Sequence, residues 1–283
     1  MSERVGVAKT YKLVLNGAFV RSESGRVYEV LDHAGRFWAN VAEASRKDVR
    51  DAVVAARAAQ ARWWSLSAYN RAQVIFRLAE MAEARRDELA EHVQRAEGRD
   101  APAARECVAR GIDRIVWYAG WADKLAQVLG GANAVAGPFF NFSLPTPSGV
   151  VAVICAQDSS FEAFVDAALA PLCAGNAVVA LASEARPTPG LLLGEMSVTS
   201  DLPGGVLNVL SGRVGSVGAS LASHEDVDGI DLDGAGDRAG ELSVLAAGSI
   251  KRVRQPGTDF AANSTARLRS FVETATVWHT VGR

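Results

Sequence analysis

Residues 150–162 read VVAVICAQDSSFE, and the first seven of them form an uninterrupted apolar run. Such a run is typical of a strand buried on both faces, as the strands of parallel sheets are. In α/β proteins, ligands usually lie where such strands end. Polar residues follow this strand directly, beginning with Gln157 and Asp158. The loop is therefore either a ligand-binding loop or the remnant of one.

Residues 150–255 continue this pattern as a repeat of strands and helices. The strands read VVAVICA, NAVVALAS, VLNVLSG, VDGIDLDG and IKRVRQ. Five strands that alternate with helices predict a parallel sheet covered on both faces. The expected fold class is α/β with a Rossmann-like five-stranded parallel sheet, but the G-x-G-x-x-G fingerprint of dinucleotide sites is absent after the first strand. The helices are predicted over about 161–173, 188–198, 215–223 and 237–247.

The chain before this repeat predicts a small β-ribbon followed by helices. Asn16-Gly17 and Ser22–Gly25 are turn signals within residues 10–40. Residues 45–48, SRKD, resemble a capping box that opens the first helix. The apolar face of that helix comprises Val49, Ala52, Val53, Ala56 and Trp63 at helical spacing. Two more helices are predicted, from about Tyr69 towards Gly98 and from about Arg105 to Gly130.

Composition excludes several classes of protein. The chain has 283 residues, 49% of them hydrophobic and 22% charged, with a net charge of −2. This balance fits an ordinary globular protein and argues against a nucleic-acid partner. No apolar run approaches the roughly 20 residues of a membrane span, and the N-terminus lacks an apolar signal sequence, so we expect a cytoplasmic protein. Cys107, Cys155 and Cys173 have no metal-ligand spacing and are expected to be buried free thiols.

Four consecutive motifs make a resemblance specific. PSGVVAVIC, APLCAGNAVVALASE, DLPGGVLNVLSG and SHEDVDGIDLDGAGDRAG resemble, in order and spacing, the cofactor-binding domain of the aldehyde dehydrogenase superfamily. The preceding helices and the FFNFSLPTPSG ribbon fit the same family. The N-terminal segment KTYKLVLNGAFVRSESGRVYEV more loosely resembles the second module of the two-module aldehyde dehydrogenases called family 16, a module that lacks the catalytic cysteine.

The resemblance implies a chemistry whose parts can be sought by position. In the family, a cysteine thiolate attacks the aldehyde, an asparagine holds the oxyanion, NAD(P) accepts hydride, and a glutamate activates water. The asparagine belongs to the loop after the first strand, where this chain has Asp158. A carboxylate there would repel an oxyanion. Since residues 159–162 match the S-x-x-E capping pattern, we expect this loop mainly to start a helix.

The positions that hold the cofactor in the family are also altered. Leu181 replaces the lysine of the K-P-S-E motif, whereas Glu184 remains. Val214 replaces the second glycine of the motif that begins at Gly212. The F-T-G-S motif has become Leu232, Asp233, Gly234 and Ala235, which puts a carboxylate near the expected pyrophosphate. Glu184, Gly212 and Gly234 are thus the vestigial cofactor-binding candidates; we expect no cofactor, with weak NAD(P) binding as the alternative.

The family's catalytic domain is the largest expected absence. No cysteine follows Cys173, and residues 254–265 lead from the last strand to ARLRSFVETATVWHTVGR, which resembles the family's C-terminal oligomerisation strand. None of His33, His92, His224 and His279 sits beside a plausible nucleophile, and His224 is expected to cap a helix end. The predicted divisions are 1–131 (β-ribbon and helices), 132–149 (oligomerisation ribbon), 150–255 (Rossmann-like core) and 256–283 (tail).

These expectations give one favoured function and two alternatives. The favoured function is a non-catalytic structural or regulatory subunit of aldehyde dehydrogenase type, an enzyme by ancestry only and inactive alone. The alternatives are an NAD(P)-binding module that serves a full-length aldehyde dehydrogenase and a true NAD-dependent oxidoreductase with an unrecognised site. A tail strand left unpaired would add to a sheet of a full-length partner, or the chain would form a homodimer through the ribbon, tail and 237–247 helix.

Overall fold

The computed structural model of the chain describes residues 8–257 and 265–281. Its centre is a seven-stranded sheet in the order β12-β11-β8-β9-β10-β2-β3. Neighbours from β12 to β10 pair in parallel, which confirms the predicted α/β class and the five parallel strands. The strands of this sheet are β2 Leu13–Leu15, β3 Ala18–Val20, β8 Val150–Ile154, β9 Ala177–Leu181, β10 Leu207–Leu210, β11 Gly229–Asp231 and β12 Arg252–Arg254.

The sheet is wider than the sequence predicts because the first hairpin joins it. β2 pairs antiparallel with β10, and β3 pairs with β2. Asn16 and Gly17 form the predicted turn, with φ angles of 51° and 72°. Asparagine and glycine tolerate this left-handed backbone, which a two-residue hairpin turn requires. β1 (Thr10–Tyr11), β4 (Val27–Leu31) and β5 (Phe37–Ala42) form a separate three-stranded sheet.

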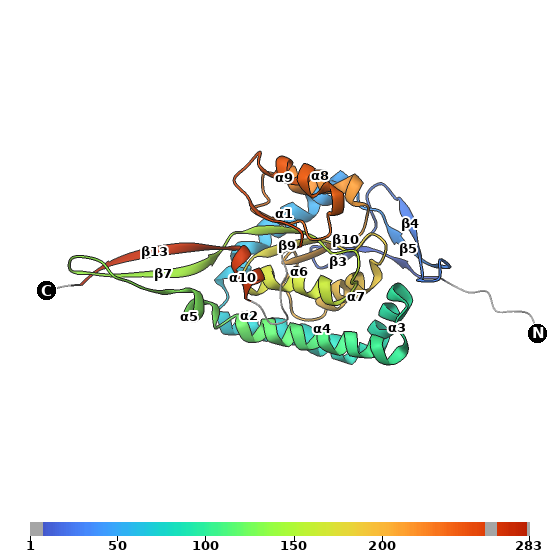
Figure 1. The fold of residues 1–283 in the computed structure, drawn as a ribbon, viewed down its shortest axis with the longest axis horizontal. Helices are drawn as coiled ribbons and strands as arrows, with labels where there is room; N and C mark the ends of the chain where they lie inside the picture. Colours follow the sequence, from blue (N-terminus) through green and yellow to red (C-terminus); the bar gives the residue numbers. More distant parts are fainter. Residues whose placement is uncertain (1–7, 258–264, 282–283) are drawn as a thin grey trace, which may run out of the picture.

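Helices cover both faces of the central sheet, as predicted (Figure 1). α1, α8 and α9 bury one apolar core against it, and α6 and α7 bury another beneath α2, α3 and α4. Among the described residues, no helix is both long and apolar enough to cross a membrane. The helices are α1 Arg46–Ser65, α2 Ala68–Ala84, α3 Arg86–Glu97, α4 Ala101–Trp121, α5 Leu125–Leu129, α6 Glu162–Cys173, α7 Thr188–Ser197, α8 Val214–Ser223, the 3₁₀ helix η1 Gly236–Arg238, α9 Ala239–Ala246 and α10 Ala266–Ser270.

The capping box at the start of α1 is confirmed. The Ser45 hydroxyl accepts from the Asp48 amide at 3.3 Å, and the Asp48 carboxylate accepts from the Ser45 amide at 2.8 Å. Asp48 also accepts a 2.7 Å bond from the Ser22 hydroxyl, so it ties the second predicted turn to the helix. The five residues expected on the inner face of α1 are all buried, as Val49 and Trp63 illustrate.

Two predicted helices have other bounds in the structure. The helix expected from Tyr69 to Gly98 is interrupted at Arg85, where the backbone leaves the helical region and α3 begins. The helix expected to begin at Arg105 starts earlier, because the Asp100 carboxylate caps it by accepting from the Ala103 amide at 2.8 Å. It also ends at Trp121, and a separate short helix, α5, follows.

A second three-stranded sheet forms a ribbon that extends away from the rest of the molecule (Figure 1). Its order is β13-β7-β6, with β6 Gly131–Asn133, β7 Phe139–Pro147 and β13 Val272–Thr280. β13 pairs with β7 along its whole length, from Val272 opposite Pro147 to Thr280 opposite Phe139. The expectation that the tail strand is left unpaired is therefore wrong: one of its edges is satisfied within the chain.

Candidate functional site

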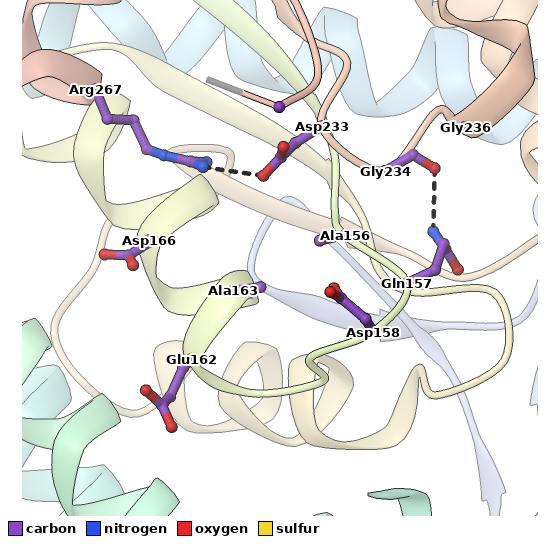
Figure 2. Close-up of a pocket in the computed structure, with 11 residues that line it drawn as sticks. Ala156, Gln157, Asp158, Glu162, Ala163, Asp166, Asp233, Gly234, Gly236 and Arg267 are labelled. Atoms are coloured by element: carbon purple, nitrogen blue, oxygen red, sulfur yellow. Dashed lines mark hydrogen bonds and ion pairs between the residues drawn. The ribbon is translucent and has the colours of Figure 1, made fainter. Parts of the chain in front are cut away.

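The topology places a crevice between β8 and β11. From β8 the chain proceeds through β9 and β10 to one side, and it then returns to β11 and β12 on the other. The loops after β8 and β11 therefore diverge at the carboxyl edge, which is where α/β sheets usually hold ligands. A cavity of about 680 Å³ opens there. It is lined by Ala156, Gln157, Asp158, Glu162, Ala163, Asp166, Asp233, Gly234, Gly236, Gly257 and Arg267 (Figure 2).

Carboxylates dominate the charged groups of this cavity, and most of them have cationic partners. Glu162 binds Arg110 at 2.7 Å. Asp166 binds Arg114 at 2.8 Å and accepts a hydrogen bond from a tyrosine hydroxyl. Within residues 8–257 and 265–281, no donor is bonded to the carboxylate of Asp158, which is exposed. The cavity therefore presents one uncompensated negative charge among paired ones.

Gln157 bridges three strand ends with its side-chain amide. Its nitrogen donates to the carbonyl oxygens of Cys155 at 2.8 Å and Gly234 at 3.4 Å. Its oxygen accepts from the Glu184 amide at 2.8 Å and the Ser183 hydroxyl at 3.2 Å. These contacts link the loops after β8, β9 and β11, and the bond to Gly234 crosses the crevice (Figure 2). Sequence reasoning assigned no role to Gln157.

The loop between β8 and α6 is held from outside by Glu97. The Glu97 carboxylate accepts from the Ser160 amide at 2.7 Å and from the Ser160 hydroxyl at 2.6 Å. It also pairs with Arg99 at 2.5 Å. Burial opposes the charge of Glu97, but these hydrogen bonds outweigh it, so the pKa of Glu97 lies below its ordinary value. The loop is therefore fixed by a buried carboxylate on α3.

The capping pair predicted within this loop does not form. The N-cap residue of α6 is Phe161, without a side-chain cap. Ser159 accepts only a 3.4 Å bond from the Ala163 amide, and Glu162 turns outward to Arg110 instead of reaching back. The prediction that residues 159–162 form a capping box is wrong, because the Glu162 carboxylate pairs with Arg110 instead.

The three predicted cofactor residues lie along the carboxyl edge but do not share one cavity. Gly234 lines the crevice, where its amide donates to the Ile154 carbonyl at 2.8 Å and a Cβ would lie 1.7 Å from the Cys155 oxygen. Glu184 lines a separate cavity of about 500 Å³ beside β4. Its carboxylate accepts from the Val214 amide at 3.2 Å, at the start of α8.

Gly212 lies at the end of β10, against the segment that precedes α1. A Cβ on Gly212 would lie 3.3 Å from the Ala44 amide nitrogen. That amide donates to the Ser211 carbonyl at 2.8 Å, so the close approach serves a contact between two parts of the backbone. Val214, which replaces a family glycine, is itself buried in the core below α8. The glycine and the valine are thus both accounted for by packing.

The three thiols are buried, as the sequence predicts. Burial and the nearby Glu162 raise the pKa of Cys107 to about 12. Burial also raises the pKa values of Cys155 and Cys173 well above the ordinary range. Cys155 ends β8 near the crevice but is only 1% exposed. A buried, protonated thiol is a poor nucleophile, so none of the three is poised to attack a ligand in the cavity.

The histidines also lie away from the crevice. His224 is the C-cap residue of α8, as predicted, and its Nδ1 accepts from the Asp226 amide at 3.2 Å in the turn that follows. His92 is buried beside Tyr11 and Trp38, and burial lowers its pKa to about 4. Among the described residues, no group of three or more histidine, cysteine, aspartate or glutamate side chains is arranged to hold a metal ion.

A buried ionic cluster, which sequence reasoning missed, closes one wall of the crevice. Asp231 is fully buried and binds Arg254 at 2.6 Å and Arg267 at 2.9 Å. Arg267 also binds Asp233 at 3.1 Å, the pair drawn in Figure 2. Burial alone would lower the pKa of Arg267, but the charges of Asp231 and Asp233 outweigh it and raise that pKa. The sequence signal that could have revealed this cluster is the presence of two charged residues, Asp231 and Arg254, within strands predicted to be buried.

Comparisons with known proteins agree with this geometry. A model described as "Aldehyde dehydrogenase family" matches residues 19–255. Aldehyde dehydrogenase family 2 member B4, mitochondrial, of Arabidopsis thaliana is 34% identical over 242 residues, which cover 84% of this chain and 44% of that protein. Benzaldehyde dehydrogenase, mitochondrial, of Antirrhinum majus is 33% identical over 245 residues, or 84% of this chain and 45% of that protein. The chain thus spans less than half the length of these two relatives.

Solved structures agree in fold. The NAD⁺ complex of an aldehyde dehydrogenase from Bacillus cereus superposes with a TM-score of 0.82 at 26% identity, covering 87% of this chain and 50% of that one. An NAD-dependent aldehyde dehydrogenase from Sinorhizobium meliloti gives a TM-score of 0.81 at 28% identity, with the same coverage of 87% and 50%.

Proposed function

The chain belongs to the aldehyde dehydrogenase family, and we propose that it acts there as a non-catalytic structural or regulatory subunit. The observation that carries this proposal is the state of its thiols. The family's chemistry needs an exposed, ionisable cysteine, whereas Cys107, Cys155 and Cys173 are buried and have raised pKa values. No thiolate is available beside the crevice to form a thioester with an aldehyde.

The other parts of the reaction are missing from the crevice as well. Asp158 stands where the family has its oxyanion asparagine, and an exposed carboxylate would destabilise a negative oxygen beside it. The two acids on α6 that line the cavity, Glu162 and Asp166, are engaged by arginines and are not free to act as general bases. In the sequence, residues 255–265 are all that separate β12 from α10.

Turnover by the purified chain tests this proposal directly. The chain is incubated with aliphatic and aromatic aldehydes and with NAD or NADP, and formation of reduced cofactor is followed by fluorescence. We expect no rate above that of a Cys107→Ser, Cys155→Ser, Cys173→Ser triple variant. A rate that exceeds this control, and that is lost in one of the single variants, would identify a working nucleophile and overturn the proposal.

A subunit also needs a partner, and the ribbon is the surface that we propose for it. Phe140 on β7 is 51% exposed, and Trp278 and Val277 on β13 are 60% and 40% exposed. Apolar side chains gathered on an extended ribbon favour association with a second copy or with a full-length family member. One edge of β13 carries no strand among the described residues, which leaves it available for strand addition.

Light scattering on the chain, alone and mixed with a full-length aldehyde dehydrogenase, tests this association. We expect a dimer or a mixed complex that Trp278→Ser dissociates, because Trp278 is exposed and its loss should leave the fold intact. Val54→Ser is the matched control, since Val54 is 56% exposed on α1. A monomer under all these conditions would remove the proposed subunit role.

A cofactor-linked role is the second candidate. Glu184, Gly212 and Gly234 persist at the carboxyl edge, and the B. cereus relative was solved as its NAD⁺ complex. On this alternative, the chain binds NAD(P) in support of a full-length aldehyde dehydrogenase. It predicts saturable cofactor binding without turnover, which separates it from the favoured proposal.

A further inference from the structure

A dinucleotide needs two things from the carboxyl edge of a parallel sheet. It needs space across the strand ends, and it needs backbone N–H groups at a helix N-terminus that are free to bind its phosphates. The helices that follow strand ends at this edge are α6 after β8, α7 after β9, α8 after β10, and η1 with α9 after β11. The groups that already occupy these positions decide whether the edge fits such a ligand.

The N-terminus of α8 is already occupied. The amide of Val214, the first residue of that helix, donates to the Glu184 carboxylate at 3.2 Å. Glu184 comes from the loop after β9, so the contact joins two neighbouring strand ends. The carboxylate supplies the negative charge that the helix dipole favours. A phosphate could bind this N–H group only by displacing a carboxylate of the chain itself.

The start of α6 is equally unfavourable for a phosphate. Glu162 is in its first turn, and the exposed Asp158 lies just before the helix without a bonded donor in the described part of the chain. Like charges near a protein surface repel each other, although water and salt screen part of the repulsion. The Asp158 carboxylate itself has no bonded donor among the described residues, and the nearby Arg186 guanidinium is engaged by the Asp158 backbone carbonyl at 2.6 Å.

The base of the crevice is closed by the backbone and by Gln157. The Gly234 amide donates to the Ile154 carbonyl at 2.8 Å, so the loop after β11 touches the end of β8. Gln157 then spans the gap above this contact and also reaches Glu184. Protein groups bind both the nitrogen and the oxygen of its amide, as they would bind the polar atoms of a ligand.

We infer that this crevice is closed to NAD(P) by the chain's own side chains: Gln157 bridges the strand ends that a dinucleotide would cross, Glu184 occupies the start of α8, and Asp158 adds an exposed carboxylate before α6. The residues present therefore do not fit the cofactor of the family. The inference deepens the proposed function, on which it rests, because a subunit without turnover has no need of a cofactor. The Gln157 side chain thus holds the strand ends together where a ligand would otherwise bind.

Calorimetric titration of the full chain with NAD and with NADP tests the closure, with thermal unfolding as a second readout. We expect no saturable heat and no rise in the melting temperature at millimolar cofactor. Saturable binding with a dissociation constant below about 1 mM would overturn the inference. Such binding without turnover would leave the non-catalytic role in place, whereas turnover in the aldehyde assay would overturn the proposed function itself.

The Gln157→Ala variant tests whether the Gln157 side chain holds the strand ends together. The variant loses four side-chain hydrogen bonds, three of which join the loop after β8 to other strand ends, and we expect its melting temperature to fall by about 3–8 °C. Gln73→Ala is the matched control, since Gln73 is exposed in the middle of α2, and it should shift the temperature by less than about 2 °C. Equal shifts in the two variants would show that the Gln157 amide does not hold the strand ends together.

Discussion

At both the amino and the carboxyl edge of the parallel sheet, a side-chain amide joins neighbouring strand ends, although α/β proteins usually leave the carboxyl edge for ligands. At the amino edge, Asn176 accepts from the Gly149 amide at 2.9 Å and donates to the carbonyls of Pro171 at 2.9 Å and Phe271 at 3.0 Å. At the carboxyl edge, Gln157 makes the corresponding bridge. An edge that α/β proteins usually leave for ligands is here bonded internally.

The two edges differ in the kind of side chain that holds the strand ends together. The amino edge relies mainly on a fully buried neutral amide, and Asp228 adds bonds to the Val150 amide and Arg57. The carboxyl edge adds a buried cluster of full charges, Asp231 with Arg254 and Arg267. Charges lose more solvation on burial than amides do, so the carboxyl edge should be the more sensitive to losing one partner.

Asp231→Asn should give the largest effect. The substitution keeps the shape of the side chain but removes its charge, so two buried guanidinium groups lose the carboxylate that they share. We expect the free energy of unfolding to fall by about 3–5 kcal/mol. Denaturant unfolding measures it, and Asp237→Asn, at an exposed position in η1, is the control with an expected change within about 0.5 kcal/mol. A loss below about 1 kcal/mol would contradict the cluster's role.

Asn176→Ala breaks the amino edge in turn. It deletes three hydrogen bonds at a side chain with no exposed surface and leaves the Gly149 amide and two carbonyls to find other partners. The expected loss is about 2–4 kcal/mol in the same assay. Asn70→Ala, exposed in the first turn of α2, provides the comparison. If Asn176→Ala costs more than Asp231→Asn, the order of sensitivity that we derive for the edges is wrong.

Acid unfolding sharpens the comparison of the two edges once the contribution of His92 to the pH dependence of stability is separated. Burial lowers the pKa of His92 from 6.5 to about 4. The unfolded chain therefore binds a proton that the folded chain does not, and stability falls as the pH drops from 6.5 towards 4, by up to about 3 kcal/mol. Unfolding measured across this range should show a flatter slope in His92→Phe. An unchanged slope would assign the titration elsewhere, for instance to Glu88 or Glu91, which face His92.

Glu97 should give the smallest effect, and it reports on the carboxyl-edge loop. Its pKa is lower in the folded protein than its ordinary value of 4.5. A lowered carboxyl pKa stabilises the fold above that ordinary value, and this stabilisation disappears as the pH falls below it towards the folded pKa. Glu97→Gln should cost about 1 kcal/mol at neutral pH and less in acid. A cost that does not change with pH would show that the charge of Glu97 is not what holds Ser160.

Local sequence signals were sufficient to predict much of this fold. The apolar runs predicted the parallel strands, Asn16-Gly17 predicted a hairpin turn, and the residues at 45 and 48 predicted a capping box that forms as expected. Each signal depends on neighbours in the chain or on strand burial. The break at Arg85 was not predicted; at this position the Arg85 side chain pairs with Glu88 and with Glu195, which lies far along the sequence.

The candidate site was harder to predict for the same reason. The departures at Asp158, Val214 and Asp233 were visible by position, but their partners were not. Arg267 reaches Asp231 and Asp233 from the far end of the described chain, and Gln157 joins loops after three different strands. The failed capping pair at residues 159–162 is the same lesson, since the Glu162 carboxylate pairs with Arg110 from α4.

The position of Arg267 in the sequence has a consequence for biosynthesis. A ribosome completes Asp231 before it adds Arg267, so a nascent chain cannot bury Asp231 with both of its cations until the α10 segment has emerged. β11 and β12 should therefore dock late, and β13 can close on β7 only after them. Chains stalled before residue 267 should be cut by protease within β11–β12 more readily than chains stalled after β13. Equal protection would show that this edge folds without its final cation.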